Sequence, residues 1–261
     1  MTLVGLQFDI VWENKPANYE KVRLLLKSAP PPPGALVVLP EMFATGFSME
    51  AVKIAELSGG PTGQFLAETA REWKIWIVAG VVRLGASGRG RNEAVVFAPD
   101  GLEKARYCKM HTFNPVGEGE HYECGDKPVT FACGQWTVAP VVCYDLRFPE
   151  VFRAGAKHGA ELFVVIANWP TSRLSHWLTL LQARAIENQA YVIGVNRCGS
   201  TPKLDYPGRS LIIGPRGEVL ADAGNAECAI RADADRESLI NYRREFNVLA
   251  DMRPEATPQT W

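Results

Sequence analysis

The sequence predicts a single α/β domain. Short, continuously apolar segments, which are typical of strands buried on both faces, alternate with segments whose apolar residues recur at helical spacing. No internal repeat and no linker divides the 261 residues, a length that can bury one large core or two modest ones. Hydrophobic residues make up 47% and charged residues 22% of the chain, which is ordinary for a soluble globular enzyme. We therefore expect one domain over residues 1–261.

The start of the chain predicts a strand, a helix and a second strand. Residues 3–9 (LVGLQFD) are expected to form a buried strand, and residues 16–28 carry apolar side chains at helical spacing. The tract PPPPG at 30–34 ends this helix because proline cannot continue it. Residues 35–40 (ALVVLP) then predict a short apolar strand, and a loop of about 18 residues follows it.

The middle of the chain predicts a helix, a strand and a hairpin. A helix is expected over residues 61–74, with proline in its first turn, and a strand over residues 75–82. The turn Pro99-Asp100-Gly101 between NEAVVFA and LEKARY indicates a β-hairpin. Residues 110–127 are polar, rich in glycine and histidine, and without periodicity. Loops of this length in a compact chain are often functional.

The second half of the chain repeats the alternation of strands and helices. Residues 136–142 (WTVAPVV) predict a strand that ends directly at Cys143, and residues 149–158 predict a helix. Residues 161–167 predict a strand and residues 172–189 a long helix. The remaining expected elements are strands at 191–196, 210–214 and 228–233, a helix over 235–244, and an irregular tail from about residue 246.

Charge and cysteine usage exclude several classes of partner. The chain has 28 Lys and Arg against 29 Asp and Glu, a net charge of −1, whereas nucleic-acid and acidic-membrane partners favour a strongly basic surface. No apolar run approaches the roughly 20 residues that cross a bilayer, and the start of the chain lacks signal-peptide features. The six cysteines form no CxxC pair and no zinc-finger spacing. We therefore expect a cytosolic protein with free thiols and no metal site.

Three residues with catalytic chemistry stand at the ends of apolar strands. Glu41 follows VVLP, Lys109 follows LEKARYC, and Cys143 follows TVAPVV. Ligands of open α/β sheets bind beyond the carboxyl ends of the strands, so these side chains could converge there. A carboxylate can take the proton of a thiol, and a lysine can stabilise the oxyanion that forms when the thiolate attacks an amide. The backbone N–H of Tyr144 is the expected second oxyanion donor.

Simpler interpretations of the same residues remain open. Cys143 could be a buried structural thiol, and Glu41 and Lys109 could be solvated side chains. A cysteine–histidine protease is a second hypothesis, and a metal site in the polar loop is a third; neither has a supporting local pattern. The histidines considered for the protease are His111, His121, His158 and His176, and the metal ligands considered are His111, Glu118, Glu120 and His121.

Several longer strings resemble one protein family. LPEMFATGF, YCKMHTF, VVCYDLRFPE, ANWPTSR and ARAIENQAYVIGVNRCG are similar, in this order, to motifs of the nitrilase or carbon–nitrogen hydrolase superfamily. The resemblance implies a four-layer α-β-β-α sandwich and a Glu-Lys-Cys triad. By motif, the triad corresponds to Glu41 in PEMF, Lys109 in CKMH and Cys143 in VCYDLRF. This chemistry requires no cofactor.

The resemblance also implies a second glutamate between the lysine and the cysteine. The family pattern places it four residues before a tyrosine. Tyr122 therefore selects Glu118 and not Glu120, although Gly119 stands where the family commonly has histidine. The expected role of Glu118 is to position the lysine and the substrate.

Within the superfamily, the motifs are most similar to those of bacterial omega-amidases. These enzymes hydrolyse 2-oxoglutaramate or 2-oxosuccinamate to the keto acid and ammonia. Such a substrate carries a carboxylate, for which Arg173 is the candidate partner. Arg147 is expected to have a structural role, paired near Asp145 or Glu150.

The resemblance leaves substrate and assembly to be tested. Phe43 and Trp169 are the expected apolar walls of the substrate site, and core packing explains each about as well. Family members commonly dimerise, so a homodimer is expected. Another branch of the superfamily, acting on N-carbamoyl amines, deaminated glutathione or aliphatic amides, is the nearest alternative. A non-catalytic member that uses the sandwich to bind a partner is a further one.

Overall fold

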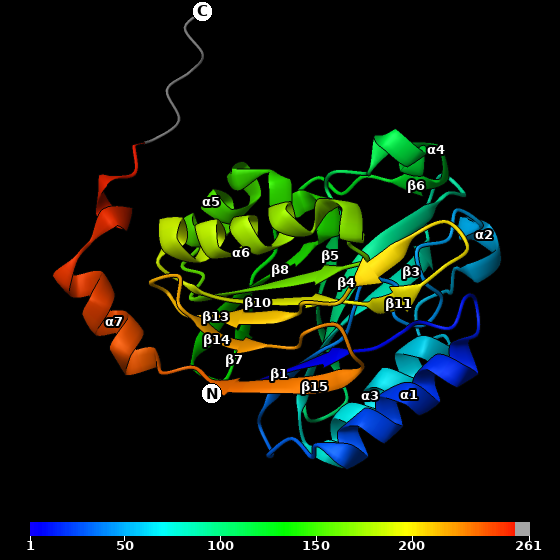
Figure 1. The fold of residues 1–261 in the computed structure, drawn as a ribbon, viewed down its shortest axis with the longest axis horizontal. Helices are drawn as coiled ribbons and strands as arrows, with labels where there is room; N and C mark the ends of the chain where they lie inside the picture. Colours follow the sequence, from blue (N-terminus) through cyan, green and yellow to red (C-terminus); the bar gives the residue numbers. More distant parts are fainter. Residues whose placement is uncertain (254–261) are drawn as a thin grey trace, which may run out of the picture.

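The predicted strands assemble into two sheets that pack face to face. The structure is a computed structural model that describes residues 1–253. In Figure 1 the sheets lie between two layers of helices, and α7 extends away from them. This arrangement confirms the four-layer α-β-β-α sandwich.

The first sheet has seven strands in the order β15-β1-β2-β3-β4-β5, with β6 paired to β4. The strands β1, β2 and β3 are parallel. The pairs β15–β1, β3–β4 and β4–β5 are antiparallel, and β6 pairs with β4 in parallel. Their bounds are β15 (Cys228–Asp233), β1 (Thr2–Gln7), β2 (Leu36–Val38), β3 (Trp76–Leu84), β4 (Gly90–Phe97), β5 (Glu103–Cys108) and β6 (Tyr122–Glu123).

The second sheet has six strands in the order β14-β13-β10-β9-β8-β7, in which β8, β9 and β10 are parallel. A separate hairpin is formed by β11 and β12. The bounds are β14 (Val219–Asp222), β13 (Leu211–Ile213), β10 (Tyr191–Asn196), β9 (Leu162–Ala167), β8 (Trp136–Val142), β7 (Phe131–Cys133), β11 (Cys198–Ser200) and β12 (Asp205–Pro207).

Helices cover the outer face of each sheet. The pair α1 and α3 packs on the first sheet, and α5 and α6 pack on the second. The helices are α1 (Lys15–Ser28), α2 (Ala51–Ile54), α3 (Pro61–Trp73), α4 (Glu118–His121), α5 (Pro149–Lys157), α6 (Leu174–Asn188) and α7 (Arg236–Glu245). Four 3-10 turns are η1 (Asn114–Val116), η2 (Cys143–Arg147), η3 (Thr171–Arg173) and η4 (Val248–Asp251).

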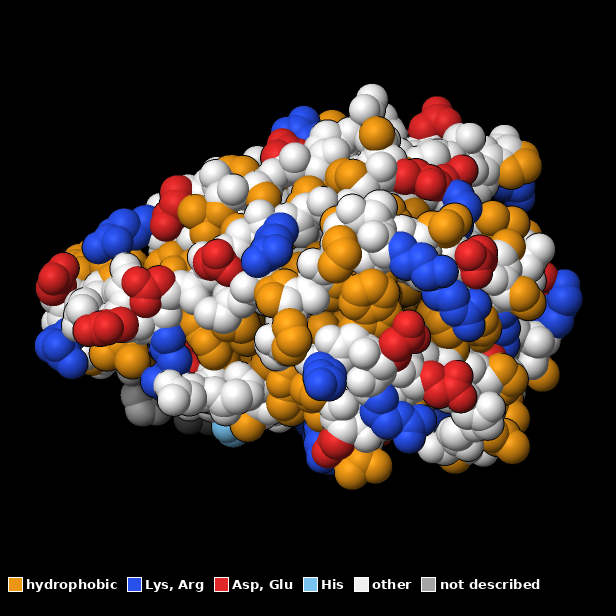
Figure 2. Space-filling model, turned by 90° about the horizontal axis from the view of Figure 1, so that it is seen from below, with side chains coloured by type: hydrophobic (Ala, Val, Ile, Leu, Met, Phe, Trp, Pro, Cys, Tyr) orange, Lys and Arg blue, Asp and Glu red, His pale blue; other side chains and the backbone are white. Residues whose placement is uncertain are grey.

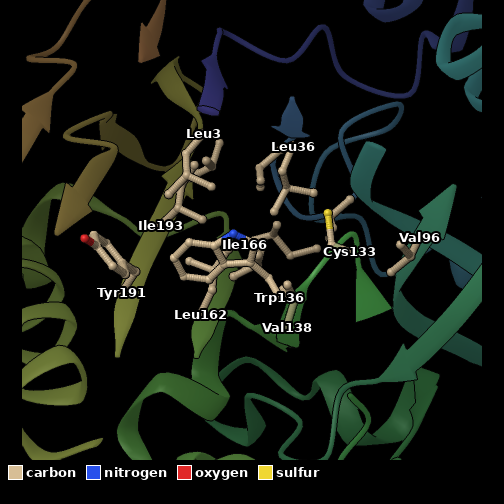
Figure 3. Close-up of a cluster of buried hydrophobic side chains, with 14 of the residues drawn as sticks. Leu3, Leu36, Val96, Cys133, Trp136, Val138, Leu162, Ile166, Tyr191 and Ile193 are labelled. Carbon is tan, nitrogen blue, oxygen red and sulfur yellow. The ribbon is translucent and has the colours of Figure 1, made fainter. Parts of the chain in front are cut away.

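The continuously apolar strands follow from burial on both faces. In β2, Leu36 and Val38 point toward the second sheet, whereas Val37 points toward the helical layer. Figure 3 shows the layer between the sheets, where Leu36 and Leu3 face Trp136 and Leu162. Burial of one such aliphatic side chain contributes about 1.5–3 kcal/mol.

The elements that sequence analysis missed are short. Among the strands and α-helices, they are β6, β7, β11, β12, β14, α2 and α4, none longer than four residues. A segment of this length does not show a helical or strand period. The tail predicted to be irregular from about residue 246 contains η4, and residues 254–261 lie outside the described residues.

The surface carries both signs of charge. Lys and Arg side chains are interspersed with Asp and Glu on the face shown in Figure 2, as the net charge of −1 leads one to expect. Within residues 1–253, no helix is long and apolar enough to cross a membrane.

Candidate active site

Cys143 lies where β8 turns into η2. Its backbone has φ of +47°, in the left-handed region that non-glycine residues rarely adopt. Such a conformation raises the energy by about 1–3 kcal/mol and persists only where the surrounding structure holds it. The turn places Cys143 at the carboxyl end of a parallel strand, on the wall of a cavity.

Glu41 is held at the end of β2 by a close contact with β3. The N–H of Gly80 donates to the carbonyl of Pro40 at 3.2 Å, and the N–H of Phe43 donates to the carbonyl of Gly80 at 3.2 Å. A Cβ on Gly80 would lie 2.4 Å from the Cα of Glu41, so only glycine permits this approach. The next residue, Met42, has φ of +46°. The Glu41 backbone is therefore fixed.

Lys109 follows β5 and connects two carboxylates. Its Nζ lies 3.1 Å from Glu41 Oε1 and 2.9 Å from Glu118 Oε2, and all three side chains are fully buried. Burial by itself lowers the pKa of Lys109, but the charges of Glu41 and Glu118 raise it well above the ordinary value. The ammonium is therefore charged at neutral pH.

Glu118 reaches this site from the first position of α4. It accepts hydrogen bonds from Lys109 Nζ and from the N–H of Phe113. Glu120, the alternative that sequence analysis set aside, is exposed. The structure thus brings together Glu41, Lys109, Glu118 and Cys143.

Two asparagines at the site were not singled out from the sequence. Asn92 on β4 donates from Nδ2 to Glu41 Oε1 at 2.7 Å and to Glu118 Oε1 at 3.0 Å. Asn168 donates its backbone N–H to Glu41 Oε2 at 2.8 Å and its Nδ2 to the Glu41 carbonyl at 2.6 Å. Asn168 belongs to the ANWPTSR motif, which was a signal for it. Asn92 has no comparable local signal.

The thiol of Cys143 is buried beside two negative charges and one positive charge. Burial raises its pKa first, and the charges of Glu41 and Glu118 raise it further. The charge of Lys109 and a hydrogen bond from the backbone of Asn168 act in the opposite direction. The net effect is a pKa well above the ordinary value, so Cys143 is a thiol at neutral pH.

A cavity of about 780 Å³ opens in front of these groups. Its walls are largely aromatic and apolar, and Glu41, Lys109, Cys143 and Asn168 contribute to its lining. The other lining residues used below are Phe47, Phe113, Tyr144, Arg147, Trp169 and Arg173. No histidine of residues 1–253 lines this cavity.

The structure places Tyr144 and Trp169 on the cavity wall, as expected, but not Phe43. Phe43 is fully buried in the layer between the first sheet and its helices, where its ring lies 6.1 Å from that of Tyr19. Its backbone bond to Gly80 holds it over the sheet, so its side chain points toward the helices. Phe47, four residues later, lines the cavity instead, with its ring centre 5.1 Å from Lys109 Nζ.

Two arginines line the cavity, and neither is paired with a carboxylate of the protein within residues 1–253. The guanidinium of Arg147 lies 4.7 Å from the ring centre of Trp169, and that of Arg173 lies 5.1 Å from the ring centre of Phe113. Burial and the charge of Arg173 lower the pKa of Arg147. Among residues 1–253, neither arginine forms an ion pair with Asp or Glu.

The predicted pairing of Arg147 with Asp145 or Glu150 is therefore wrong. Asp145 is fully buried and accepts hydrogen bonds from Tyr107 at 2.8 Å and from the N–H and Nδ1 of His111. Its lone pairs are used there, and Arg147 turns toward the cavity.

Two of the four groups considered as metal ligands, His111 and Glu118, make other contacts, and the other two, Glu120 and His121, are exposed. His111 contacts Asp145 and stacks on Phe148, while Glu118 contacts Lys109. Within the part of the chain that the structure describes, no group of three or more His, Cys, Asp or Glu side chains could hold a metal ion.

Comparison with known proteins agrees with this geometry. The profile of the carbon–nitrogen hydrolase family matches residues 2–244. The 2-oxoglutaramate amidase of Bacillus subtilis is 33% identical, with 97% of this chain and 98% of that protein covered. The omega-amidase YafV of Escherichia coli K12 is 37% identical, with 94% of each covered. The structure of XC1258 from Xanthomonas campestris, a CN-hydrolase superfamily protein, has a TM-score of 0.91 at 29% identity over 98% of both chains. This chain therefore belongs to the carbon–nitrogen hydrolase family.

Proposed function

We propose that this protein is an amidase that hydrolyses the terminal amide of a short keto-dicarboxylic acid monoamide, 2-oxoglutaramate or 2-oxosuccinamate, to the acid and ammonia. The observation that carries the proposal is the fully buried Lys109 ammonium, held by Glu41 and Glu118 beside Cys143 at the cavity wall. The names of the relatives in Bacillus subtilis and Escherichia coli support the substrate.

In the proposed first half-reaction, Glu41 takes the proton of Cys143 as Sγ attacks the amide carbon. The carbonyl electron pair moves to oxygen, and Lys109 Nζ and the N–H of Tyr144 stabilise the oxyanion. When this intermediate collapses, the C–N bond breaks and protonated Glu41 returns the proton to the leaving ammonia. A thioester on Cys143 remains.

In the second half-reaction, Glu41 takes a proton from water as its oxygen attacks the thioester. As the C–S bond breaks, its electron pair stays on sulfur, protonated Glu41 gives its proton to Sγ, and the carboxylic acid leaves, which restores the thiol of Cys143 and the carboxylate of Glu41. Acid–base catalysis of this kind contributes about 10²–10⁴-fold, and one oxyanion donor about 10²–10³-fold. Glu118 has the role of holding Lys109 in place.

Arg147 and Arg173 are the proposed partners of the substrate carboxylate. Both guanidiniums lie against aromatic rings of the cavity wall, and neither has a protein carboxylate to neutralise it within residues 1–253. A substrate carboxylate would supply the missing negative charge through charge-assisted hydrogen bonds. Phe47 and Trp169 supply apolar walls.

The test is ammonia release from 2-oxoglutaramate, succinamate and N-carbamoyl amino acids, by wild type and Cys143→Ala. Fast turnover of 2-oxoglutaramate that is lost in Cys143→Ala is expected. Turnover of only the N-carbamoyl compounds would overturn the substrate and retain the triad. Unchanged turnover by a folded Cys143→Ala protein would overturn the mechanism.

Three further expectations belong to this proposal. A homodimer, a cytosolic location and a reaction without a cofactor all accompany the resemblance to omega-amidases. Light scattering of the purified protein tests the first, and activity after dialysis against a chelator tests the last.

A further inference from the structure

Asn92 lies between the two carboxylates that surround Lys109. It is 1% exposed, and its Nδ2 donates to Glu41 Oε1 at 2.7 Å and to Glu118 Oε1 at 3.0 Å. The orientation of the amide follows from chemistry, because a carboxylate accepts hydrogen bonds and only the NH₂ end of the amide can donate them. The backbone carbonyl of Asn92 also accepts the N–H of Lys109 at 2.9 Å. Asn92 thus contacts all three charged residues of the site.

These contacts divide the two oxygens of Glu41 between different tasks. Oε1 accepts from both Asn92 Nδ2 and Lys109 Nζ, so its two lone-pair directions are used. Oε2 accepts a close hydrogen bond from the N–H of Asn168 at 2.8 Å and a long one from Asn168 Nδ2 at 3.4 Å, and this Nδ2 lies closer to the Glu41 carbonyl, at 2.6 Å. Oε2 is therefore the less strongly bonded oxygen, because only its long contact with Asn168 Nδ2 has to give way to the proton of Cys143.

We propose that Asn92 is a positioning residue. It holds the carboxylates of Glu41 and Glu118 against the ammonium of Lys109, and it orients Glu41 so that Oε2 is the oxygen that accepts the proton of the Cys143 thiol. The inference rests on the proposed roles of Glu41 and Cys143. It adds a residue that acts through the carboxylates and does not touch the substrate.

The site requires a neutral double donor at this position. Two carboxylates already share one ammonium, and a third carboxylate would oppose ionisation of Cys143. A hydroxyl group could donate only one hydrogen and would leave one carboxylate without its bond. The other titratable groups that interact with these carboxylates are Tyr122 and Tyr206.

The test is Asn92→Asp, with Asn188→Asp as matched control. Asn188 is also fully buried, donates from Nδ2 to the carbonyl of Arg184 at 3.0 Å and, like Asn92, has an Oδ1 without a partner among the described residues. It lies at the end of α6, away from Glu41. The same chemical change is thus made once at the site and once at a helix end.

Kinetics are measured with succinamate and 2-oxoglutaramate, using whichever the wild type hydrolyses faster. In Asn92→Asp, kcat falls about 10²-fold, a loss typical of a reacting group displaced by about 1 Å, while KM stays near the wild-type value. The acidic limb of the kcat/KM profile moves to higher pH, because a carboxylate that loses a donor and gains a like-charged neighbour holds its proton more strongly. Asn188→Asp lowers Tm but keeps the wild-type kcat and pH profile.

A folded Asn92→Asp protein with wild-type kcat and pH profile would overturn the inference. Equal losses of kcat in the two variants, without a change of pH profile, would overturn it as well, because they would indicate a purely structural role. If Asn92→Asp does not fold, Asn92→Ala decides by the same two readouts. Cys143→Ala, measured in parallel, separates the questions: its inactivity supports the triad whatever Asn92 does.

Discussion

Two neighbouring residues of β4, Asn92 and Glu93, face opposite sides of the first sheet and lie in two different charge clusters. Asn92 points inward, to Lys109 and its two carboxylates. Glu93 points outward and is 1% exposed. The outer cluster pairs Glu93 with Arg83 at 3.1 Å, Arg91 at 2.9 Å and Arg106 at 2.6 Å.

The clusters differ in charge balance and in access to water. Around Glu93, three arginines share one buried carboxylate, Arg91 also pairs with Glu123 and Arg106 with Glu103, and each guanidinium remains partly exposed. Around Lys109, one cation serves two carboxylates, and all three side chains are fully buried. The outer cluster thus has one carboxylate for each cation and access to water, whereas the inner cluster has an excess of negative charge that water does not reach. We infer that the outer cluster stabilises the fold and that the inner one is reserved for chemistry.

The largest expected effect follows from Lys109→Met. Two carboxylates would remain buried without a cation, so the unfolding free energy should fall by about 3–5 kcal/mol. The oxyanion would lose its main donor, so kcat should fall about 10²–10³-fold. Ammonia release and urea denaturation measure the two effects. Lys104→Met is the matched control, five residues earlier on β5, because Lys104 is exposed and pairs only with Asp100 at 2.9 Å within the described residues. A Lys109→Met protein with more than a tenth of wild-type activity would contradict the distinction between the clusters.

Glu93→Gln tests the outer cluster. Three guanidiniums would lose their shared carboxylate, and we expect a loss of about 1–3 kcal/mol of unfolding free energy, with partial exposure of the arginines limiting the effect. Turnover by the folded protein should equal that of the wild type. A large loss of kcat without a loss of stability would mean that the outer cluster takes part in the reaction.

The same variant has a defined pH dependence. Burial raises the pKa of Glu93, but hydrogen bonds and charges from Arg83, Arg106 and Arg91 lower it below its ordinary value overall. Because the pKa of Glu93 is lower in the folded than in the unfolded protein, its ion pairs contribute their full stabilisation above the unfolded-state pKa of about 4.3. This stabilisation is lost as the pH falls through the folded-state pKa. The stability difference between wild type and Glu93→Gln should therefore be constant from pH 7 to about pH 5 and shrink below about pH 4. Urea titrations across this range measure it, and a difference that persists at pH 3 would contradict the ionic origin.

The contrast also explains what could be predicted from the sequence. The apolar strands and amphipathic helices carry local periods, and they were placed within a few residues. Glu41, Lys109 and Cys143 follow apolar strands within recognisable motifs, so their convergence could be expected. Asn92 has neither signal, because its role depends on the register of β4 beside β5 and on two carboxylates distant in sequence.

Aromatic and cationic residues of the cavity were harder to assign. Phe43 and Phe47 stand in the same motif, and only the positive φ at Met42 and the bond to Gly80 decide which ring faces the cavity. Arg147 lies near two acidic residues in sequence, which suggested a local ion pair. The buried contacts of Asp145 with Tyr107 and His111 exclude that pairing, and they join segments 34 or more residues apart.

The two arginines of the cavity sharpen the comparison, because within residues 1–253 neither Arg147 nor Arg173 is paired with a carboxylate. Arg173→Met and Arg147→Met should each raise KM for 2-oxoglutaramate about 10- to 100-fold, the loss of one charged hydrogen bond of roughly 1.5–3 kcal/mol. A neutral amide is the control, since its KM should change little. Equal increases of KM for charged and neutral amides would indicate a general distortion of the cavity and not a carboxylate subsite.

The smallest expected effect concerns the reactivity of the free thiol. Burial, Glu41 and Glu118 raise the pKa of Cys143, so alkylation by iodoacetamide should accelerate from pH 7 to pH 9 without a plateau. Glu118→Gln removes one negative charge, which lowers the pKa of Cys143; each unit of decrease gives about ten times more thiolate. This variant should therefore be alkylated faster than the wild type at every pH, although it turns over substrate more slowly.

The alkylation is followed on the Cys143 peptide by mass spectrometry, because the thiol of Cys124 is exposed and can react as well. Cys133, which burial gives a pKa of about 12, is the internal control and should stay unmodified. An alkylation rate that levels off below pH 7 would mean that the free protein already holds a thiolate. In that case Lys109 would outweigh both carboxylates, and the inner cluster would resemble the outer one, with its charge balanced before any substrate arrives. Slower alkylation of Glu118→Gln would lead to the same conclusion, because it would mean that Glu118 acts on the thiol through Lys109 more than through its own charge.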